Sequence, residues 1–197
     1  RNQTIKSILY SWKKILHVGL PAIASNLIAP LSSALVTALV SSYGQAAVAA
    51  FGLAGRIEAL MIVIFISLGG AVAPYVGQNF GAKRFDRLTD GFKFCARLSL
   101  FYAIFCIIIF YAFSGPLLGF FTQEPEVIRI AKIQLTYTPW GYGFLGLVAL
   151  CNGSFNALGK PIPAMTISIS RTLLIYVPMA YFLASIYGIK GVFMGQV

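Results

Sequence analysis

The chain has 197 residues, of which 58% are hydrophobic and 10% charged, and its mean hydropathy is +0.83. A soluble domain usually carries about 25% charged residues, so a soluble enzyme, a disordered tail and a disulfide-linked scaffold are all disfavoured, and a polytopic membrane protein remains. Fifteen Lys and Arg residues against five Asp and Glu give a formal net charge of +10. In a membrane protein, Lys and Arg residues gather in cytoplasmic loops and beside lipid headgroups. We therefore expect membrane lipid, and no nucleic acid, as a partner.

Five apolar segments are each long enough to cross a membrane as a helix, which takes about 20 residues. In chain order they are residues 15–41, 47–75, 93–120, 129–156 and 163–187, and the start of a sixth lies near residue 191. Alternation of apolar and polar residues is almost absent, so we predict an all-α polytopic transmembrane helix bundle that forms one lobe over residues 1–197. A first residue other than Met and an apolar C-terminal end indicate a piece of a longer protein.

Short segments rich in glycine and charge are predicted to connect the spans. The longest is GQNFGAKRFDRLTDGF, residues 77–92. With the proline just before it, this segment is expected to hold a cytoplasmic-turn motif, in which glycines let the chain turn tightly. The motif comprises Pro74, Gly77, Gln78, Asn79 and Gly81. It is interpreted either as a helix end with an interfacial basic patch or as a latch between the lobes of a transporter.

Several prolines lie inside or at the ends of the predicted spans. Pro125 is expected in the first turn of the fourth span, where its missing N–H is tolerated. Pro139 and Pro178 lie within spans and predict bends there. Bent helices are typical of membrane bundles that surround a cavity, although inert bundles also contain them.

The basic residues also predict an orientation. With a cytoplasmic N-terminus, ten of the fifteen Lys and Arg residues fall on the cytoplasmic side and three on the other side, while Arg56 and Arg171 lie within spans. Because cytoplasmic loops are enriched in Lys and Arg, we predict a multi-pass plasma-membrane protein with the N-terminus of this segment in the cytoplasm.

Three ionisable residues, Arg56, Glu58 and Arg171, lie inside predicted spans, where charge is costly and therefore informative. Arg56 and Glu58 are two residues apart, so they do not face each other on one helix. Glu58 and Arg171 lie at similar depths, so we expect them to pair or to share a polar network. The pair is interpreted either as a structural salt bridge or as a coupling site in which Glu58 binds a proton or a sodium ion.

Other polar and aromatic residues are candidates for the wall of a substrate cavity. Amides within spans can contact a substrate, but they can also cap helices or join them by hydrogen bonds. Aromatic rings can offer a face to a cation, although such rings more often pack or lie at membrane interfaces. These candidates are Asn26, Asn152, Asn156, Tyr137 and Trp140.

Catalytic chemistry has little support in the sequence. There is one histidine, Glu58 is the only acid within a span, and the three cysteines lack metal-ligand spacing. We therefore expect no enzyme, no metal site and no cofactor beyond a coupling ion.

Four segments of the chain resemble the multidrug and toxic compound extrusion (MATE) transporters. They read ILHVGLPAIASNL, ALVSSYGQAAVAAFGLAGRIEAL, GGAVAPYVGQNFGAKRFDR and NGSFNALGKPIPAM. The resemblance runs over nearly the whole chain, and VGQNFGA is its most specific part.

This resemblance implies a twelve-helix protein of two six-helix lobes that exchanges sodium ions or protons for organic, often cationic, compounds by alternating access. It implies that this chain is the second, C-terminal lobe, with the missing first lobe and a small organic substrate as partners. Sodium-coupled members often carry acids in helices seven and ten. The corresponding spans here have none, so either Glu58 serves alone or coupling relies on the other lobe.

Two rival functions remain at this point. A lipid-linked oligosaccharide flippase of related architecture would need cationic residues to bind pyrophosphate, and only Arg56 and Arg171 qualify. A non-transporting membrane scaffold would need no ionisable residue at mid-depth, so the same residues and Glu58 count against it.

Overall fold

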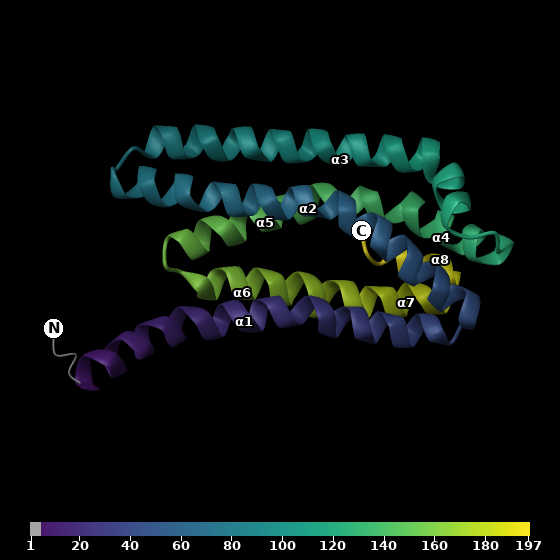
Figure 1. The fold of residues 1–197 in the computed structure, drawn as a ribbon, viewed down its shortest axis with the longest axis horizontal. Coiled ribbons are helices and arrows are strands. Elements are labelled where there is room, and N and C mark those ends of the chain that lie inside the picture. Colours follow the sequence, from purple (N-terminus) through teal and green to yellow (C-terminus); the bar gives the residue numbers. More distant parts are fainter. Residues whose placement is uncertain (1–4) are drawn as a thin grey trace.

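Long helices connected by very short turns form the whole described fold (Figure 1). The computed structural model describes residues 5–197, and of these the side chains of residues 10–17, 19, 20, 23, 24, 27, 28 and 30–197. In this part of the chain the regular elements are all helices, so the predicted all-α bundle is confirmed.

The first three helices have the same length of 37 residues: α1 (Ile5–Ser41), α2 (Gln45–Gly81) and α3 (Phe85–Phe121). At 1.5 Å per residue each is about 55 Å long, well beyond the roughly 30 Å of a hydrocarbon core. By length and composition, α2, α3 and the run Pro161–Tyr187 are the described helices suited to crossing a membrane.

The predicted long connection at residues 77–92 is wrong. Helix α2 continues through Gly77 to Gly81, and only three residues separate it from α3. The turn instead depends on Lys83, whose φ of 55° lies in the left-handed region that non-glycine residues seldom adopt. Gly77 and Gly81 thus lie in the last turns of α2. The chain reverses direction after the motif, at residues 82–84.

The later predicted spans contain irregular helical turns. Helix α4 (Pro125–Tyr137) begins with proline, as predicted, and a 3₁₀ turn, η1 (Thr138–Gly141), joins it to α5 (Tyr142–Ala157). The tighter turn coincides with Pro139, which cannot donate a main-chain hydrogen bond.

A wider turn interrupts the fifth predicted span. Helix α6 (Pro161–Ile169) leads through a π-helical segment, η2 (Ser170–Tyr176), into α7 (Val177–Tyr187). Pro178 is the second residue of α7, so a main-chain donor is missing just where the helix returns to α geometry. A short helix, α8 (Ile189–Met194), ends the described chain and packs against α7 and α4.

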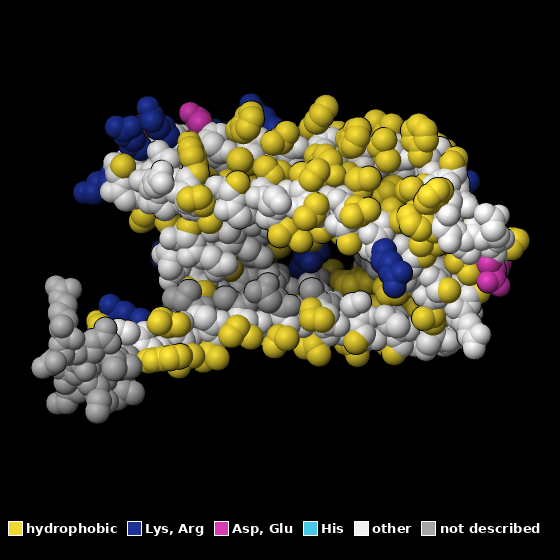
Figure 2. Space-filling view, viewed as in Figure 1, with side chains coloured by type: hydrophobic (Ala, Val, Ile, Leu, Met, Phe, Trp, Pro, Cys, Tyr) yellow, Lys and Arg dark blue, Asp and Glu magenta, His cyan; other side chains and the backbone are white. Residues whose placement is uncertain are grey.

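Helix α2 lies at the centre and packs against α5, α4 and α3. Its N-terminal half buries Ala47, Ala50 and Ala54 completely, in line with the small residues expected where membrane helices approach closely. Much of the outer surface is apolar (Figure 2), as a bundle in contact with lipid requires.

The contact of α2 with α5 depends on glycine. A Cβ added to Gly69 would lie 2.7 Å from the main-chain oxygen of Ala149, and one added to Gly153 would overlap the main-chain oxygen of Gly69. The two helices therefore touch through their backbones, and any side chain at these glycines would push them apart.

We expect Gly153→Ala to lower the free energy of unfolding by about 1–3 kcal/mol, because the added methyl group overpacks this contact. Gly70→Ala is the matched control, since a Cβ there has no atom within 4 Å. Thermal unfolding of the purified protein measures both. Equal midpoints for the two variants would contradict close backbone packing at Gly153.

Candidate coupling and substrate site

A buried carboxylate in α2 is the centre of the site. Glu58 is only 8% exposed, although it lies within an apolar helix. The hydroxyl of Thr138, in η1, donates a hydrogen bond to Glu58 Oε1. Gln134, one turn earlier in α4, lines the groove together with Glu58. A charged group inside an apolar bundle needs a hydrogen-bond partner, and here the partner comes from another part of the chain.

The local structure explains how Thr138 reaches Glu58. Gln134 and Thr138 are four residues apart, so they lie on the same face of the helical run. The Thr138 hydroxyl is also 3.0 Å from the main-chain oxygen of Gln134, and this contact fixes the orientation of the Thr138 side chain. Because α4 packs along α2, this polar face meets the carboxylate.

Two cavities meet at Glu58. The larger, which we call the groove, has a volume of about 550 Å³, and the smaller, the inner cavity, about 200 Å³. Figure 2 shows the molecule hollowed between α2 and α1, with basic side chains at the hollow. Residues from α1, η2 and the chain end after α8 line both cavities with Glu58: Ser32, Tyr176 and Gln196.

Arg56 and Arg171 enter different cavities. Arg56 is exposed and lines the groove, whereas Arg171 lines the inner cavity from η2. The Nε atom of Arg171 is buried without a hydrogen-bond partner in the described part of the chain. Each guanidinium group therefore belongs to a residue in the wall of a cavity that Glu58 also lines.

A direct ion pair between Glu58 and Arg171 is not found in the described part of the chain. The ion pair that is formed there joins Arg129 to Glu126 at 2.6 Å, on the surface at the start of α4. The hydrogen bond from Arg129 lowers the pKa of the Glu126 carboxyl. Glu58 and Arg171 instead share the inner cavity, with Tyr176 also in its wall.

Four of the five predicted substrate residues have described side chains, and these lie outside the two cavities. Asn152 Nδ2 donates to Ser168 Oγ at 2.9 Å and so joins α5 to α6, while Asn156 is exposed near the end of α5. Tyr137 packs against the core and Trp140 is 60% exposed. The side chain of Asn26 is outside the described residues. Of the four that are described, none lines the groove or the inner cavity.

The turn-motif residues lie at the far end of the α2–α3 hairpin, away from Glu58 (Figure 1). No group of three or more His, Cys, Asp or Glu side chains suited to a metal ion occurs among the residues searched, which are those described.

We expect Thr138→Val to lower the free energy of unfolding by about 1.5–3 kcal/mol, because it leaves a buried carboxylate without its hydroxyl donor. Thr136→Val is the matched control: that hydroxyl donates to Lys132 O, one turn back on the same helix. Thermal unfolding at neutral pH compares them. If Thr138→Val lowers the free energy of unfolding no more than Thr136→Val does, the hydrogen bond to Glu58 does not stabilise the fold.

Known proteins match this chain over most of its length. The MatE family pattern covers residues 21–182. The chain is 29% identical over 184 residues to the FAD transporter of Shewanella oneidensis. This alignment covers 93% of this chain and 41% of that protein. It is 31% identical over 170 residues to the probable multidrug resistance protein YoeA of Bacillus subtilis, covering 86% of this chain and 37% of that protein.

A solved structure has the same fold. The Vibrio cholerae MATE transporter VcmN in its bent form superposes with a TM-score of 0.90 at 33% identity, over 100% of this chain and 44% of that one. The chain thus spans about two fifths of the length of these relatives. With its helical membrane bundle and a match covering most of its residues, the chain belongs to the MatE family, whose members are transporters and not enzymes.

Proposed function

We propose that this chain is the second, C-terminal lobe of a cation-coupled exporter of small organic compounds, and that Glu58 binds the coupling ion. The observation that carries the proposal is the position of this carboxylate, buried in a membrane helix and shared by two cavities. An ionisable group in such a place is a functional feature by default, because a purely structural role can be filled by apolar residues at lower cost.

The surroundings of Glu58 can accommodate both an empty and an ion-bound carboxylate. A threonine hydroxyl donates to an ionised carboxylate and can turn to accept from a protonated one, so Thr138 remains paired in both states. A sodium ion would instead be bound through oxygen atoms, which Glu58, Thr138 and Gln134 carry. The proposal includes both proton and sodium coupling, and the response to each ion gradient imposed alone distinguishes them.

The missing first lobe would complete the substrate path. The groove opens between α1 and α2, and apolar side chains along both helices remain exposed. Alternating access by one lobe moving against the other is typical of transporters built from two repeats with a binding site between them. The basic turn between α2 and α3 supports a plasma-membrane protein in which this turn and the N-terminus of the segment are cytoplasmic.

A second cargo class has support of its own. The groove and the inner cavity contain two guanidinium groups, of Arg56 and Arg171, against one carboxylate. This balance favours a negatively charged compound over a cation, and the Shewanella relative is named a FAD transporter. Its name and that of the multidrug resistance protein favour transport over the scaffold alternative.

We expect Glu58→Gln in the full-length protein to reduce gradient-driven efflux of a cationic dye from vesicles at least tenfold, because glutamine cannot exchange a proton or hold a cation as a carboxylate does. Proton and sodium gradients are imposed separately, so the wild-type response identifies the ion. Glu126→Gln is the control, since that acid is exposed and lies at the start of α4.

Efflux by Glu58→Gln that still follows the imposed gradient would make Glu58 structural and place coupling in the other lobe. Absence of gradient-driven efflux in the wild type, together with movement of a lipid-linked oligosaccharide, would instead favour the flippase alternative.

Arg56→Gln separates the two cargo classes. If the cargo is anionic, we expect uptake of a flavin nucleotide into inverted vesicles to fall about five- to tenfold, because an attractive charge in the groove is lost. If the cargo is cationic, dye transport should be unchanged or faster. Lys190→Gln, an exposed charge outside both cavities, is the control. Equal losses for both variants would exclude a direct role for Arg56.

A further inference from the structure

Two adjoining hollows occupy the end of the α2–α3 hairpin, far from Glu58. One, of about 630 Å³, is polar and is lined by Tyr75, Gln78, Asn79, Ala82, Arg84, Arg87 and Asp90. The other, of about 450 Å³, is mostly apolar and is lined chiefly by Ala71, Val72, Phe94 and Cys95. Tyr75 and Asp90 line both, so the two hollows share a border.

The border is built by a tyrosine fixed between two helices. The hydroxyl of Tyr75, on α2, donates to the main-chain oxygen of Arg87, on α3, at 2.6 Å. Its ring takes the space that a side chain at Gly91 would fill, with Cζ 2.6 Å from where a Cβ would stand. The hydrogen bond uses only the backbone of Arg87, so the guanidinium group remains exposed at the polar hollow.

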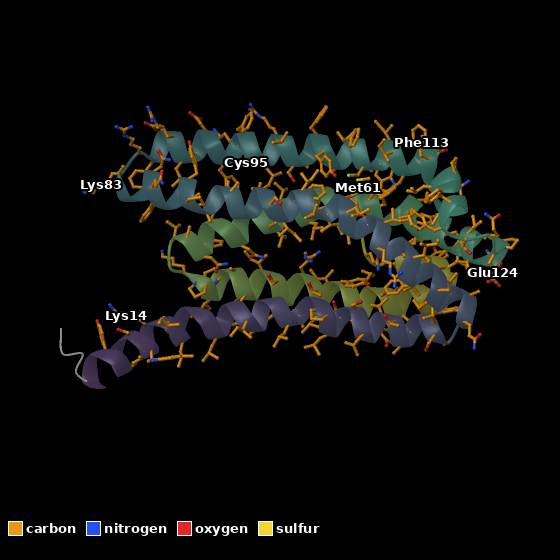
Figure 3. All side chains as sticks on the ribbon, viewed as in Figure 1. Lys14, Met61, Lys83, Cys95, Phe113 and Glu124 are labelled. Atoms are coloured by element: carbon orange, nitrogen blue, oxygen red, sulfur yellow. The ribbon has the colours of Figure 1, made fainter. Side chains whose placement is uncertain are left out.

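The polar hollow carries excess positive charge. Arg84 and Arg87 line it and form no ion pair in the described part of the chain, and Lys83 and Lys93 lie close by in sequence. Asp86 and Asp90 are the acids of this region. Figure 2 shows the basic side chains gathered at this end of the molecule, and Figure 3 labels Lys83 at the turn and Cys95 further along α3.

The helices leave the apolar layer at this level. Phe80 and Phe85, both exposed, pack edge to face with ring centres 5.9 Å apart across the turn. Aromatic rings beside arginines are typical of the boundary between hydrocarbon and headgroups. The polar hollow therefore lies at headgroup level, and the apolar hollow points into the hydrocarbon.

We infer that the two hollows together bind one anionic glycerophospholipid, with its phosphate at Arg84 and Arg87 and an acyl chain along Ala71, Val72 and Phe94. Arginine forks match phosphate oxygens, and basic pockets between membrane helices bind anionic headgroups. The carboxylate of Asp90 can accept hydrogen bonds from headgroup hydroxyls, so a phosphatidylglycerol fits all three features. A free phosphate would leave the apolar hollow unused.

The test uses the full-length protein, stripped of lipid in detergent and titrated with phosphatidylglycerol or with phosphatidylcholine of the same acyl chains. Native mass spectrometry counts the lipids bound. We expect tighter binding of phosphatidylglycerol, weakened about twenty-five-fold in the double variant Arg84→Gln/Arg87→Gln, since each basic residue at the surface contributes about a factor of five. Lys132→Gln/Lys190→Gln, with the same loss of charge elsewhere, should change it less than threefold.

The apolar hollow is tested separately by Ala71→Phe, which fills it and leaves both arginines in place. Here we expect the preference for long-chain over dihexanoyl phosphatidylglycerol to disappear. Equal affinity for the two headgroups, competition by inorganic phosphate at equal concentration, an affinity unchanged in the arginine variant, or a long-chain preference that persists in Ala71→Phe would overturn the inference. Binding that neither variant changes would mean that another part of the protein covers the hairpin end.

Discussion

The burial of one carboxylate in α2 constrains how the other helices pack around it. A charge that leaves water loses several kcal/mol of solvation unless hydrogen bonds replace it. Glu58 obtains such a bond from Thr138 in η1, so the helical run beginning at Pro125 must lie against α2 in one register. The groove and the inner cavity both border the carboxylate that this register holds in place.

Regular and irregular backbone have different places in this arrangement. Helix α2 is unbroken and touches α5 through glycine, which makes the pair stiff. Thr138 and Arg171, by contrast, belong to a 3₁₀ and a π-helical turn. Irregular backbone at membrane depth is tolerated where it lines a cavity, and both turns do so here. This part of the chain thus combines a close-packed pair of helices with two irregular turns that line the inner cavity.

Much of this fold could be predicted from hydropathy, because crossing a membrane demands long apolar runs whatever the packing. Glu58 could be singled out for the same reason. The turn at residues 77–92 was not predictable in this way: glycine and charge indicate loops in water, yet Gly77 and Gly81 lie inside α2. Hydropathy carries no information on whether a helix continues beyond the lipid.

The residues that surround Glu58 were harder to predict from the sequence. Depth along two helices placed Glu58 and Arg171 at one level, but depth does not determine the direction in which a side chain points, and the two share a cavity without pairing. Gln134 and Thr138, four apart in an apolar helix, were the available signal for the carboxylate's partners. No sequence signal indicated Tyr176 and Gln196, because their proximity to Glu58 depends on how α7 and α8 pack.

The hydrogen bond between Glu58 and Thr138 spans 80 residues of chain. Ribosomes add roughly 5–20 residues per second, so the carboxyl group is made about 4–16 s before its partner. In that interval the hairpin of α2 and α3 has no Thr138 to receive Glu58, and water or the insertion machinery must shield it. Thr138 can hold Glu58 only once α4 and η1 have been made, so the polar contact is completed later than the hairpin of α2 and α3.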